Sequence, residues 1–202
     1  MTARLSHLTL PGSPAAWDAL VPDWLGSSDG RLRLRGPDLV WPDPPVEHLG
    51  WVFDGPFGPS TCDGIPVAFA PATESGETAL GGLGNIDHIV ITTDSIERTA
   101  AAIEALTGEG LRRIRETGDV RQGFHRLGPG GTILELVERA GVATALWGFV
   151  LTVPDLDEVV AAGGDLVSPA RDAVQPGRRI ATVDRRAGLG TAVAFMTPET
   201  SR

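Results

Sequence analysis

The sequence predicts an α+β fold built from tandem modules, each containing a strand, a helix and three further strands (βαβββ). Three observations support this prediction. Residues 85–139 show a strand, an amphipathic helix and three strands in that order. The same order returns in residues 145–198, and short segments of the first 75 residues repeat strand sequences from the second half. Because duplicated units change the fold, these internal repeats decide the expected architecture.

The composition is that of a globular protein with an acidic surface. Hydrophobic residues make up 42% and charged residues 21% of the 202 residues. The 26 glycines and 16 prolines predict short elements joined by frequent turns. The formal net charge of −9 argues against nucleic acid as a partner, because phosphate binding needs a basic face.

The residue types also exclude several chemistries. All 17 basic residues are arginine, and the chain contains no lysine and no tyrosine. A lysine Schiff base, a P-loop lysine and a tyrosine acid or base are therefore excluded. The single cysteine, Cys62, cannot form an internal disulfide, and its sequence context favours a packed side chain over a nucleophile.

The N-terminus and the hydropathy pattern favour a cytoplasmic protein. Residues 1–7 contain no apolar run of signal-peptide length, and no stretch approaches the length of a membrane span. We therefore expect a small-molecule ligand as the partner, and neither a nucleic acid nor a membrane.

The first half predicts short strands separated by turns. Strands are expected at residues 4–10, 31–35, 38–41, 48–53 and 65–69. A short helix at 15–20 follows Ser13 and Pro14, a favourable pair for a helix N-terminus. Arginine and leucine alternate from Arg31 to Arg35, which indicates a strand with one buried and one solvated face.

A linker separates the two halves. Residues 71–84 are rich in alanine, glycine, threonine and glutamate, a composition typical of a linker. The predicted boundaries place an abbreviated region at 1–75, the linker at 76–84 and the better-defined domain at 85–198.

The second half contains the clearest elements. Asp94 and Ser95 are helix N-cap candidates, and apolar residues recur at helical spacing from Ile96 to Leu106. The first module is expected to have strands at 86–92, 111–116, 122–127 and 132–138 and a helix at 96–106. The second module is expected to have strands at 146–153, 165–168, 178–184 and 191–196 and a helix over 159–162.

Three short repeats indicate that the first half is a shortened copy of the second. Residues 5–10 (LSHLTL) resemble 86–91 (IDHIVI), 49–53 (LGWVF) resemble 147–151 (WGFVL), and 67–70 (VAFA) resemble 193–196 (VAFM). A duplication would leave four modules, at 4–42, 47–72, 85–139 and 145–198.

The ordered βαβββ plan, with Asp87-His88-Ile89-Val90-Ile91 followed by Leu134-Glu135-Leu136-Val137, resembles the vicinal oxygen chelate superfamily. This group contains glyoxalases, bleomycin-resistance proteins and extradiol dioxygenases. The resemblance covers residues 85–198 and extends weakly over 4–75. It implies that paired modules curl their mixed sheets into a glyoxalase-like cup over a concave site. Metal enzymes of the family bind a divalent ion there, with side chains from the first and last strands of each module.

Carried over residue by residue, the resemblance assigns His88 and Glu135 to the two metal-ligand positions of the first module. Imidazole and carboxylate suit Zn, Ni, Fe, Mn or Co. The second module departs from the pattern, because Gly148 stands where His88 would and Ala194 near the place of Glu135. A catalytic site usually has three or more protein ligands, so the metal site is expected to be incomplete. The sequence establishes no cofactor, and a divalent metal is the one that the resemblance implies.

The N-terminal copy shows the same asymmetry. His7 matches the first ligand position of this copy. Gly50 stands at the corresponding position of its second module, and residues 39–41 offer no carboxylate. The ligand residues of the second module are missing in both halves of the chain. This agreement favours a property of the protein over an error in the alignment.

Several roles stay open for the pair in the first module. His88 is a hydrogen-bonded residue of the cup, a metal ligand or a general base, and neutral imidazole suits the last role near pH 7. Glu135 is a catalytic carboxylate, a ligand or a structural partner of an arginine. A metal-free pair would transfer protons if burial raised the pKa of the glutamate.

Candidates for substrate binding in the cup are Gln122, His125, Trp147 and Arg179. His125 would supply a third ligand if it pointed into the cup, and an edge histidine is the alternative. Arg178 and Arg179 face opposite sides of a strand, and we favour Arg179 as the one that holds a substrate carboxylate or phosphate. Trp147 would either wall an apolar pocket or pack in the core.

Three functions follow from these alternatives. The first is a glyoxalase-like lyase or isomerase that uses His88 and Glu135 for proton transfer beside a carbonyl group. The second is a non-catalytic protein that sequesters a drug or metabolite. The third is a divalent-metal-dependent lyase, isomerase or dioxygenase that completes its site with His125 or with a residue from the partner chain of a homodimer.

Overall fold

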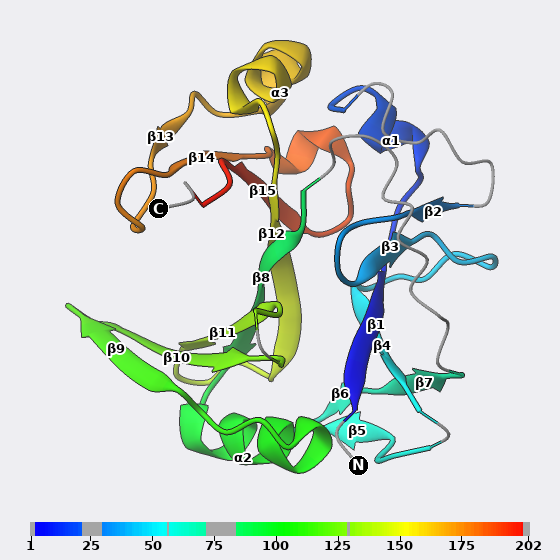
Figure 1. The fold of residues 1–202 in the computed structure, drawn as a ribbon, viewed down its shortest axis with the longest axis vertical. Helices are drawn as coiled ribbons and strands as arrows, with labels where there is room; N and C mark the ends of the chain where they lie inside the picture. Colours follow the sequence, from blue (N-terminus) through cyan, green and yellow to red (C-terminus); the bar gives the residue numbers. More distant parts are fainter. Residues whose placement is uncertain (1–2, 22–29, 56, 72–83, 129, 200–202) are drawn as a thin grey trace.

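The structure is a computed structural model that describes residues 3–21, 30–55, 57–71, 84–128 and 130–199. Two larger sheets, one from each half of the chain, lie side by side (Figure 1). A short ribbon of β5 (Thr61–Cys62) and β6 (Ile65–Pro66) accompanies them. Among the described residues no helix is long and apolar enough to cross a membrane.

The larger sheet comes from the second half of the chain. Its strands are β8 (Ile86–Thr93), β9 (Arg113–Thr117), β10 (Val120–Arg126), β11 (Ile133–Glu138), β12 (Ala145–Thr152), β13 (Arg171–Asp172), β14 (Arg179–Thr182) and β15 (Ala192–Met196). The helical segments are α2 (Ile96–Thr107), α3 (Leu156–Gly163) and the 3-10 turns η1 (Gly164–Leu166) and η2 (Arg185–Ala187). The strand order is β13-β14-β15-β12-β8-β11-β10-β9.

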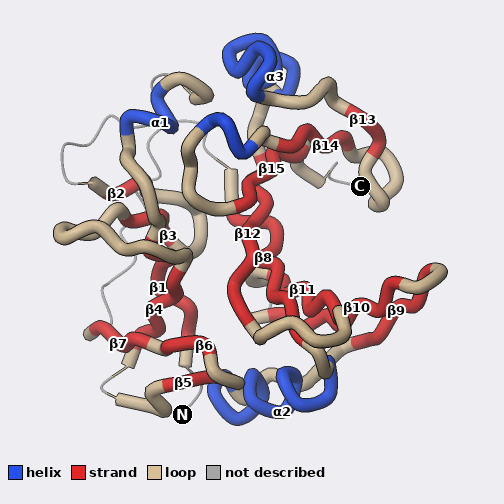
Figure 2. The backbone as a smooth tube through the Cα atoms, turned by 180° about the vertical axis from the view of Figure 1, so that it is seen from behind, coloured by secondary structure: helices blue, strands red, loops and turns tan. Residues whose placement is uncertain are grey.

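The strand pairings of this sheet repeat about its centre. β8 and β12 pair antiparallel in the middle. Each has a parallel neighbour on its outer side, β11 and β15, and beyond that an antiparallel one, β10 and β14. The two wings project from the central strands to the same side (Figure 2). This arrangement confirms the α+β class and the pairing of two βαβββ modules.

Alternation along the central strands defines the two faces of the sheet. His88, Val150 and Ala194 are register partners and share one face, which we call the cup face. Phe149 points to the opposite face, where its ring stacks on that of Trp17 from the first half.

The helix ends follow ordinary capping chemistry. The Ser95 side chain accepts a hydrogen bond from the backbone N–H of Arg98 at the start of α2, and Gly108 ends that helix with φ of 74°. The Asp155 side chain caps α3 by accepting from two backbone N–H groups of its first turn. Apolar residues at helical spacing, including Ile96 and Ile103, are fully buried.

The sheet of the first half is an abbreviated copy of the larger one. Its elements are β1 (Arg4–Thr9), α1 (Ala15–Asp18), β2 (Arg31–Leu32), β3 (Asp38–Val40), β4 (Gly50–Asp54) and β7 (Ala68–Ala70). The order β2-β3-β1-β4-β7 matches β10-β11-β8-β12-β15, and each neighbouring pair has the same parallel or antiparallel sense. The internal repeats predicted this correspondence.

The two halves share one hydrophobic core. The rings of Trp17 in α1 and Phe149 in β12 are nearly parallel, with centroids 6.1 Å apart, and both side chains are buried. Large aromatic side chains dominate core energetics through the area that they remove from water. The first half therefore covers the face of the larger sheet that lies opposite the cup face.

A polar cluster also joins the halves. Asp63, between β5 and β6, accepts hydrogen bonds from Arg98 Nε at 2.6 Å, from Thr144 Oγ1 at 2.9 Å and from Thr99 Oγ1. Burial alone would raise the pKa of the Asp63 carboxyl, but these hydrogen bonds hold it below its usual value. We call these four residues the Asp63 cluster.

Some expected elements differ from the structure. Residues 164–166 form the turn η1, and the edge strand begins later, at Arg171, so the strand expected at 165–168 is wrong. The expected strand at 65–69 is split between β6 and β7, and β5 lies in a predicted loop. The predicted linker, apart from Gly84, lies outside the described residues.

Candidate functional site

A β-bulge at Asp87 shapes the centre of the cup face. His88 is opposite Val150 and Ile86 is opposite Leu151, so Asp87 has no register partner on β12. A bulge re-aims side chains at the point where the ladder is interrupted. Asp87 and His88 consequently meet, with 2.8 Å between Asp87 Oδ2 and His88 Nδ1.

Arg178 binds the other oxygen of the same carboxylate. Its Nη1 lies 2.7 Å from Asp87 Oδ1, and its Nε donates to the Thr197 carbonyl at 2.8 Å. The arginine side chain is only 4% exposed. Burial by itself would raise the pKa of Asp87, but the hydrogen bonds from His88 and Arg178 lower it below its usual value. Asp87 is therefore held as a carboxylate.

Glu135 approaches His88 from the neighbouring strand. Its Oε2 lies 3.4 Å from His88 Nε2, and the two side chains are 15% and 12% exposed. The register of β11 opposite β8 and β10 places Glu135 across from Val90 and Phe124, on the cup face. The contact between the two predicted residues thus follows from strand pairing.

A second pair of polar side chains supports Glu135. Gln122 Nε2 donates to Glu135 Oε1, and Arg115 Nε donates to Gln122 Oε1 at 2.9 Å. The Arg115 and Arg113 guanidinium groups lie 5.6 Å and 4.8 Å from the centroid of the Phe124 ring. The first wing of the cup is therefore polar and rich in arginine.

The contacts of His88 bear on which ring nitrogen carries a proton. When Asp87 accepts from Nδ1–H, a neutral imidazole presents the lone pair of Nε2 toward Glu135. A lone pair facing a carboxylate is repulsive, so the contact is favourable when one proton lies between Nε2 and Oε2. Such a shared proton is the arrangement that an acid–base pair needs.

The second module places a small apolar cluster next to the site. Val150, Ala194 and Met196 are buried together, with Ala173 and Ile180 packed beside them. Val150 is the register partner of His88, so this cluster adjoins the His88–Glu135 pair. One half of the cup can thus hold an apolar group while the other handles a polar one.

The donor set does not complete a metal centre. Among the residues that the structure describes, no group of three or more histidine, cysteine, aspartate or glutamate side chains is placed to hold an ion. In the second module, Gly148 and Ala194 lack donor atoms. A Cβ on Gly148 would lie 2.2 Å from the Ala192 carbonyl oxygen, so the backbone there has no room for a side chain. A three-ligand divalent centre does not fit these residues.

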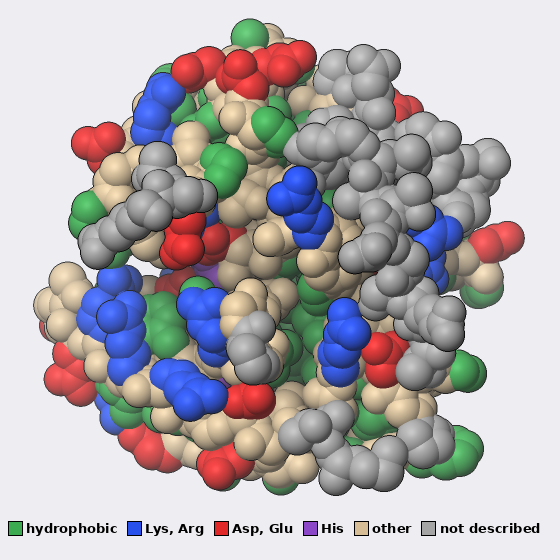
Figure 3. Space-filling model, in the orientation of Figure 1, with side chains coloured by type: hydrophobic (Ala, Val, Ile, Leu, Met, Phe, Trp, Pro, Cys, Tyr) green, Lys and Arg blue, Asp and Glu red, His purple; other side chains and the backbone are tan. Residues whose placement is uncertain are grey.

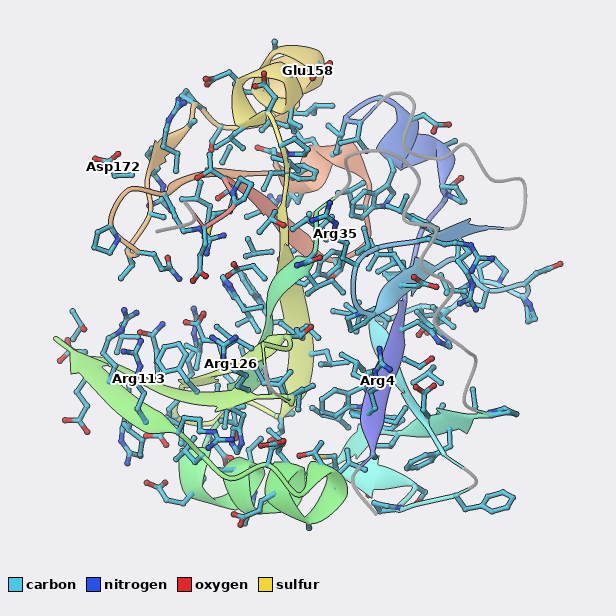
Figure 4. The ribbon with its side chains drawn as sticks, in the orientation of Figure 1. Arg4, Arg35, Arg113, Arg126, Glu158 and Asp172 are labelled. Atoms are coloured by element: carbon cyan, nitrogen blue, oxygen red, sulfur yellow. The ribbon has the colours of Figure 1, made fainter. Side chains whose placement is uncertain are left out.

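A groove of about 880 Å³ adjoins the cup between the two halves of the chain. Asp87, which contacts His88, and Arg178 also line it. Arg4 and Arg35 line it from the first half, and Arg113 and Arg126 from the second (Figure 4). This volume is typical of sites that bind small organic molecules.

The structure brings three of the predicted site residues together and separates another. His88, Glu135 and Gln122 form one connected group. The expectation that His125 points into the cup is wrong, because Phe124 is the residue opposite Glu135. His125 is buried on the other face, where its Nδ1 lies 3.1 Å from the Glu109 carbonyl, so it cannot complete a site with His88.

The preference for Arg179 over Arg178 is also corrected. Arg179 is exposed and forms two hydrogen bonds of 2.9 Å with Asp157 on α3, outside the cup. Arg178 is the arginine that reaches the site. Trp147 is 54% exposed beside the second bulge of β12, so it does not pack in the core, and its role as a pocket wall stays a prediction.

Two site residues were not identified from the sequence. Asp87 stands next to His88, and an aspartate adjacent to a candidate histidine was the available signal. Arg115 had no signal, because its place depends on the pairing of β9 with β10, which puts it opposite Gln122.

Comparison with known proteins supports the fold. No family model and no curated protein sequence matches the chain. A solved structure named methylmalonyl-CoA epimerase from Mycobacterium tuberculosis matches 62% of this chain and 95% of its own, with a TM-score of 0.50 and 13% identity. A Streptomyces coelicolor methylmalonyl-CoA epimerase in complex with 2-nitronate-propionyl-CoA matches 58% of this chain and 99% of its own, with a TM-score of 0.49 and 19% identity. At these identities the likeness concerns architecture, and the chain has the fold of the vicinal oxygen chelate superfamily.

Proposed function

We propose that this protein is an enzyme of the lyase or isomerase type that moves a proton beside a carbonyl group of a small organic molecule bound in the cup. The observation that carries the proposal is the 3.4 Å contact between His88 Nε2 and Glu135 Oε2 in a mostly buried site. An imidazole and a carboxylate in contact can take a proton from a carbon and return it.

The surrounding contacts suit this role. Asp87 accepts from Nδ1 of His88 and fixes the orientation of the imidazole, while Arg178 balances the charge of Asp87. Gln122 holds one oxygen of Glu135 and leaves the other for the histidine. Each member of the pair is therefore held in place before a substrate arrives.

The step balances without a further reactant. The basic member of the pair removes a proton from the carbon next to the carbonyl, and the electron pair of that C–H bond moves onto the carbonyl oxygen to give an enolate. Return of a proton to either face of that carbon re-forms the C–H bond. An apolar substituent would lie against Val150 and Met196 of the apolar cluster.

Solvent deuterium exchange tests the proposal. The purified protein is incubated in D₂O with a panel of 2-substituted acyl thioesters, 2-oxo acids and hydroxyketones, and exchange next to the carbonyl is followed by proton NMR. Methylmalonyl-CoA belongs in the panel because an epimerase of that name shares the fold. We expect exchange with at least one class, reduced by about 100-fold or more in His88→Gln and in Glu135→Gln.

Arg179→Gln is the matched control, because Arg179 lies outside the cup. It should exchange the same substrate at the wild-type rate. Exchange that survives in both His88→Gln and Glu135→Gln would remove the pair from the chemistry.

The apolar cluster favours a second candidate, a non-catalytic protein that sequesters a drug or metabolite. Val150, Ala194 and Met196 form a hydrophobic wall that would bind a ligand without any proton transfer. This alternative predicts a compound that binds with the same affinity to wild type and His88→Gln and that shows no exchange in D₂O. Isothermal titration calorimetry combined with the NMR assay separates the two functions.

A further inference from the structure

The groove between the two halves has a charge opposite to that of the protein. The described residues that line it include five arginines and three carboxylates, an excess of two positive charges among them in a chain with a net charge of −9. Two of the carboxylates are already paired, Asp87 with Arg178 at 2.7 Å and Glu109 with Arg112 at 2.8 Å. A local excess of positive charge on an acidic protein attracts anions.

The arginines reach the groove from separate elements. Arg4 comes from β1, Arg35 from the loop after β2, Arg113 from β9 and Arg126 from β10 (Figure 4). Basic side chains lie around the hollow that opens on this side of the molecule (Figure 3). Like charges gathered from both halves add their fields, which raises the positive potential in the groove.

Arg178 provides a second reason to expect an anion in the groove. Arg178 lines it with a side chain that is only 4% exposed, and its Nη2 has no hydrogen-bond partner among the described atoms. A buried guanidinium N–H without a partner costs free energy. An oxygen of a bound ligand, beside Asp87 and next to His88, would satisfy it.

We propose that this groove binds a multiply charged organic anion, a molecule with phosphate or carboxylate groups at one end and its reactive end at Asp87 and Arg178, next to the His88–Glu135 pair. The anionic groups lie among Arg4, Arg35 and Arg126. The groove volume of about 880 Å³ leaves room for a ligand larger than a simple keto acid. This assignment of substrate class rests on the proposed function, although anion binding itself requires no chemistry.

Calorimetric titration with two probes tests the inference. Inorganic pyrophosphate and citrate are each titrated into the full chain at 50 mM and 300 mM NaCl. We expect saturable binding at one site, weakened about tenfold or more in Arg35→Gln/Arg126→Gln and weakened by the higher salt. Tighter binding of pyrophosphate identifies phosphate as the anionic group, and tighter binding of citrate identifies carboxylate.

The control for charge is Arg139→Gln, which removes one positive charge from an exposed position outside the groove and is compared with Arg35→Gln and Arg126→Gln taken singly. It should bind within twofold of wild type. Absence of saturable binding for both probes overturns the inference, as does equal weakening in Arg139→Gln and the single groove variants. A thermal melt of each variant establishes that it is folded.

His88→Gln separates this inference from the proposed function. It should bind the probes as wild type does, because His88 does not line the groove. Loss of exchange with retained anion binding supports both statements. Retained exchange with no anion binding overturns only the assignment of substrate class.

Discussion

Arg178 and Asp87 join the two modules of the larger sheet through a buried ion pair of 2.7 Å. Asp87 belongs to the first strand of one module, and Arg178 immediately precedes β14 of the other. The pair also orients His88, since the same carboxylate accepts from its Nδ1. Cohesion of the sheet and geometry of the site thus depend on one carboxylate.

Arg178→Met should destabilise the fold by about 3 kcal/mol, because removal of one partner leaves the Asp87 charge buried and unpaired. The double variant Arg178→Met/Asp87→Asn should recover part of that loss, since both charges are then gone. Urea unfolding followed by circular dichroism measures each free energy. Arg179→Gln, at the adjacent exposed position, should change little, and an equal effect of both arginines would contradict this account of Arg178.

The stability of the protein should fall between pH 7 and pH 5 through His125. Burial lowers the pKa of His125, and its Nε2 has no partner in the described structure. Below the ordinary value of about 6.5 the unfolded chain takes up a proton that the folded chain does not, so the free energy of unfolding decreases as pH falls. His125→Asn should flatten this dependence in urea unfolding measured from pH 5 to 8.

His48→Asn is the control for the histidine experiment, because His48 is exposed. Its stability should follow the wild-type pH curve. A slope that is unchanged in His125→Asn would assign the pH dependence to other groups, of which His7 is one, since burial lowers its pKa as well.

The Asp63 cluster should contribute measurably to the association of the halves. Asp63→Ala removes the acceptor of Arg98, Thr99 and Thr144 and should lower the free energy of unfolding by about 2 kcal/mol. Asp63 has a φ of 47°, a region that asparagine tolerates, so Asp63→Asn isolates the loss of charge from backbone strain. Asp63→Asn should be intermediate in urea unfolding. An Asp63→Ala variant as stable as wild type would show that the cluster adds nothing.

The ligand position at Gly148 should not tolerate a side chain. In Gly148→Ala the new Cβ would lie 2.2 Å from the Ala192 carbonyl oxygen, which forces β12 and β15 apart and should cost about 2 kcal/mol. Thermal unfolding measures the effect. Gly36→Ala is the control, because a Cβ there meets open space and the stability should be nearly unchanged. Gly118→Ala would not serve as a control, because its φ is positive. Equal melting temperatures for the two variants would show that the sheet absorbs the added methyl group.

Elements with long periodic patterns could be predicted from the sequence. The strand expected at 86–92 is β8, and the helix expected at 96–106 is α2, each within one residue at its ends. Their apolar spacing and caps are local properties that do not depend on neighbours. The first half could be recognised as a copy because its strand sequences repeat.

The site could be predicted only in part, because strand register is not a local property. Alternation indicates that Arg178 and Arg179 face opposite sides but not which of them faces the cup. His125 faces away from the cup because Phe124 is paired with Glu135. Asp87 contacts His88 because of the β-bulge in β8. His88 and Glu135 could be anticipated because the family resemblance supplies the register that the sequence lacks.

The abbreviated copy has a consequence for how the groove is assembled. Arg4 and Arg35 come from one half of the chain and Arg113 and Arg126 from the other, and a single polypeptide joins them. Their encounter is therefore intramolecular, at an effective concentration that the linker sets and that dilution does not change. A binding surface divided between two separate subunits would come apart at low protein concentration, because the subunits would dissociate. Both sides of this groove are present in every molecule of the protein.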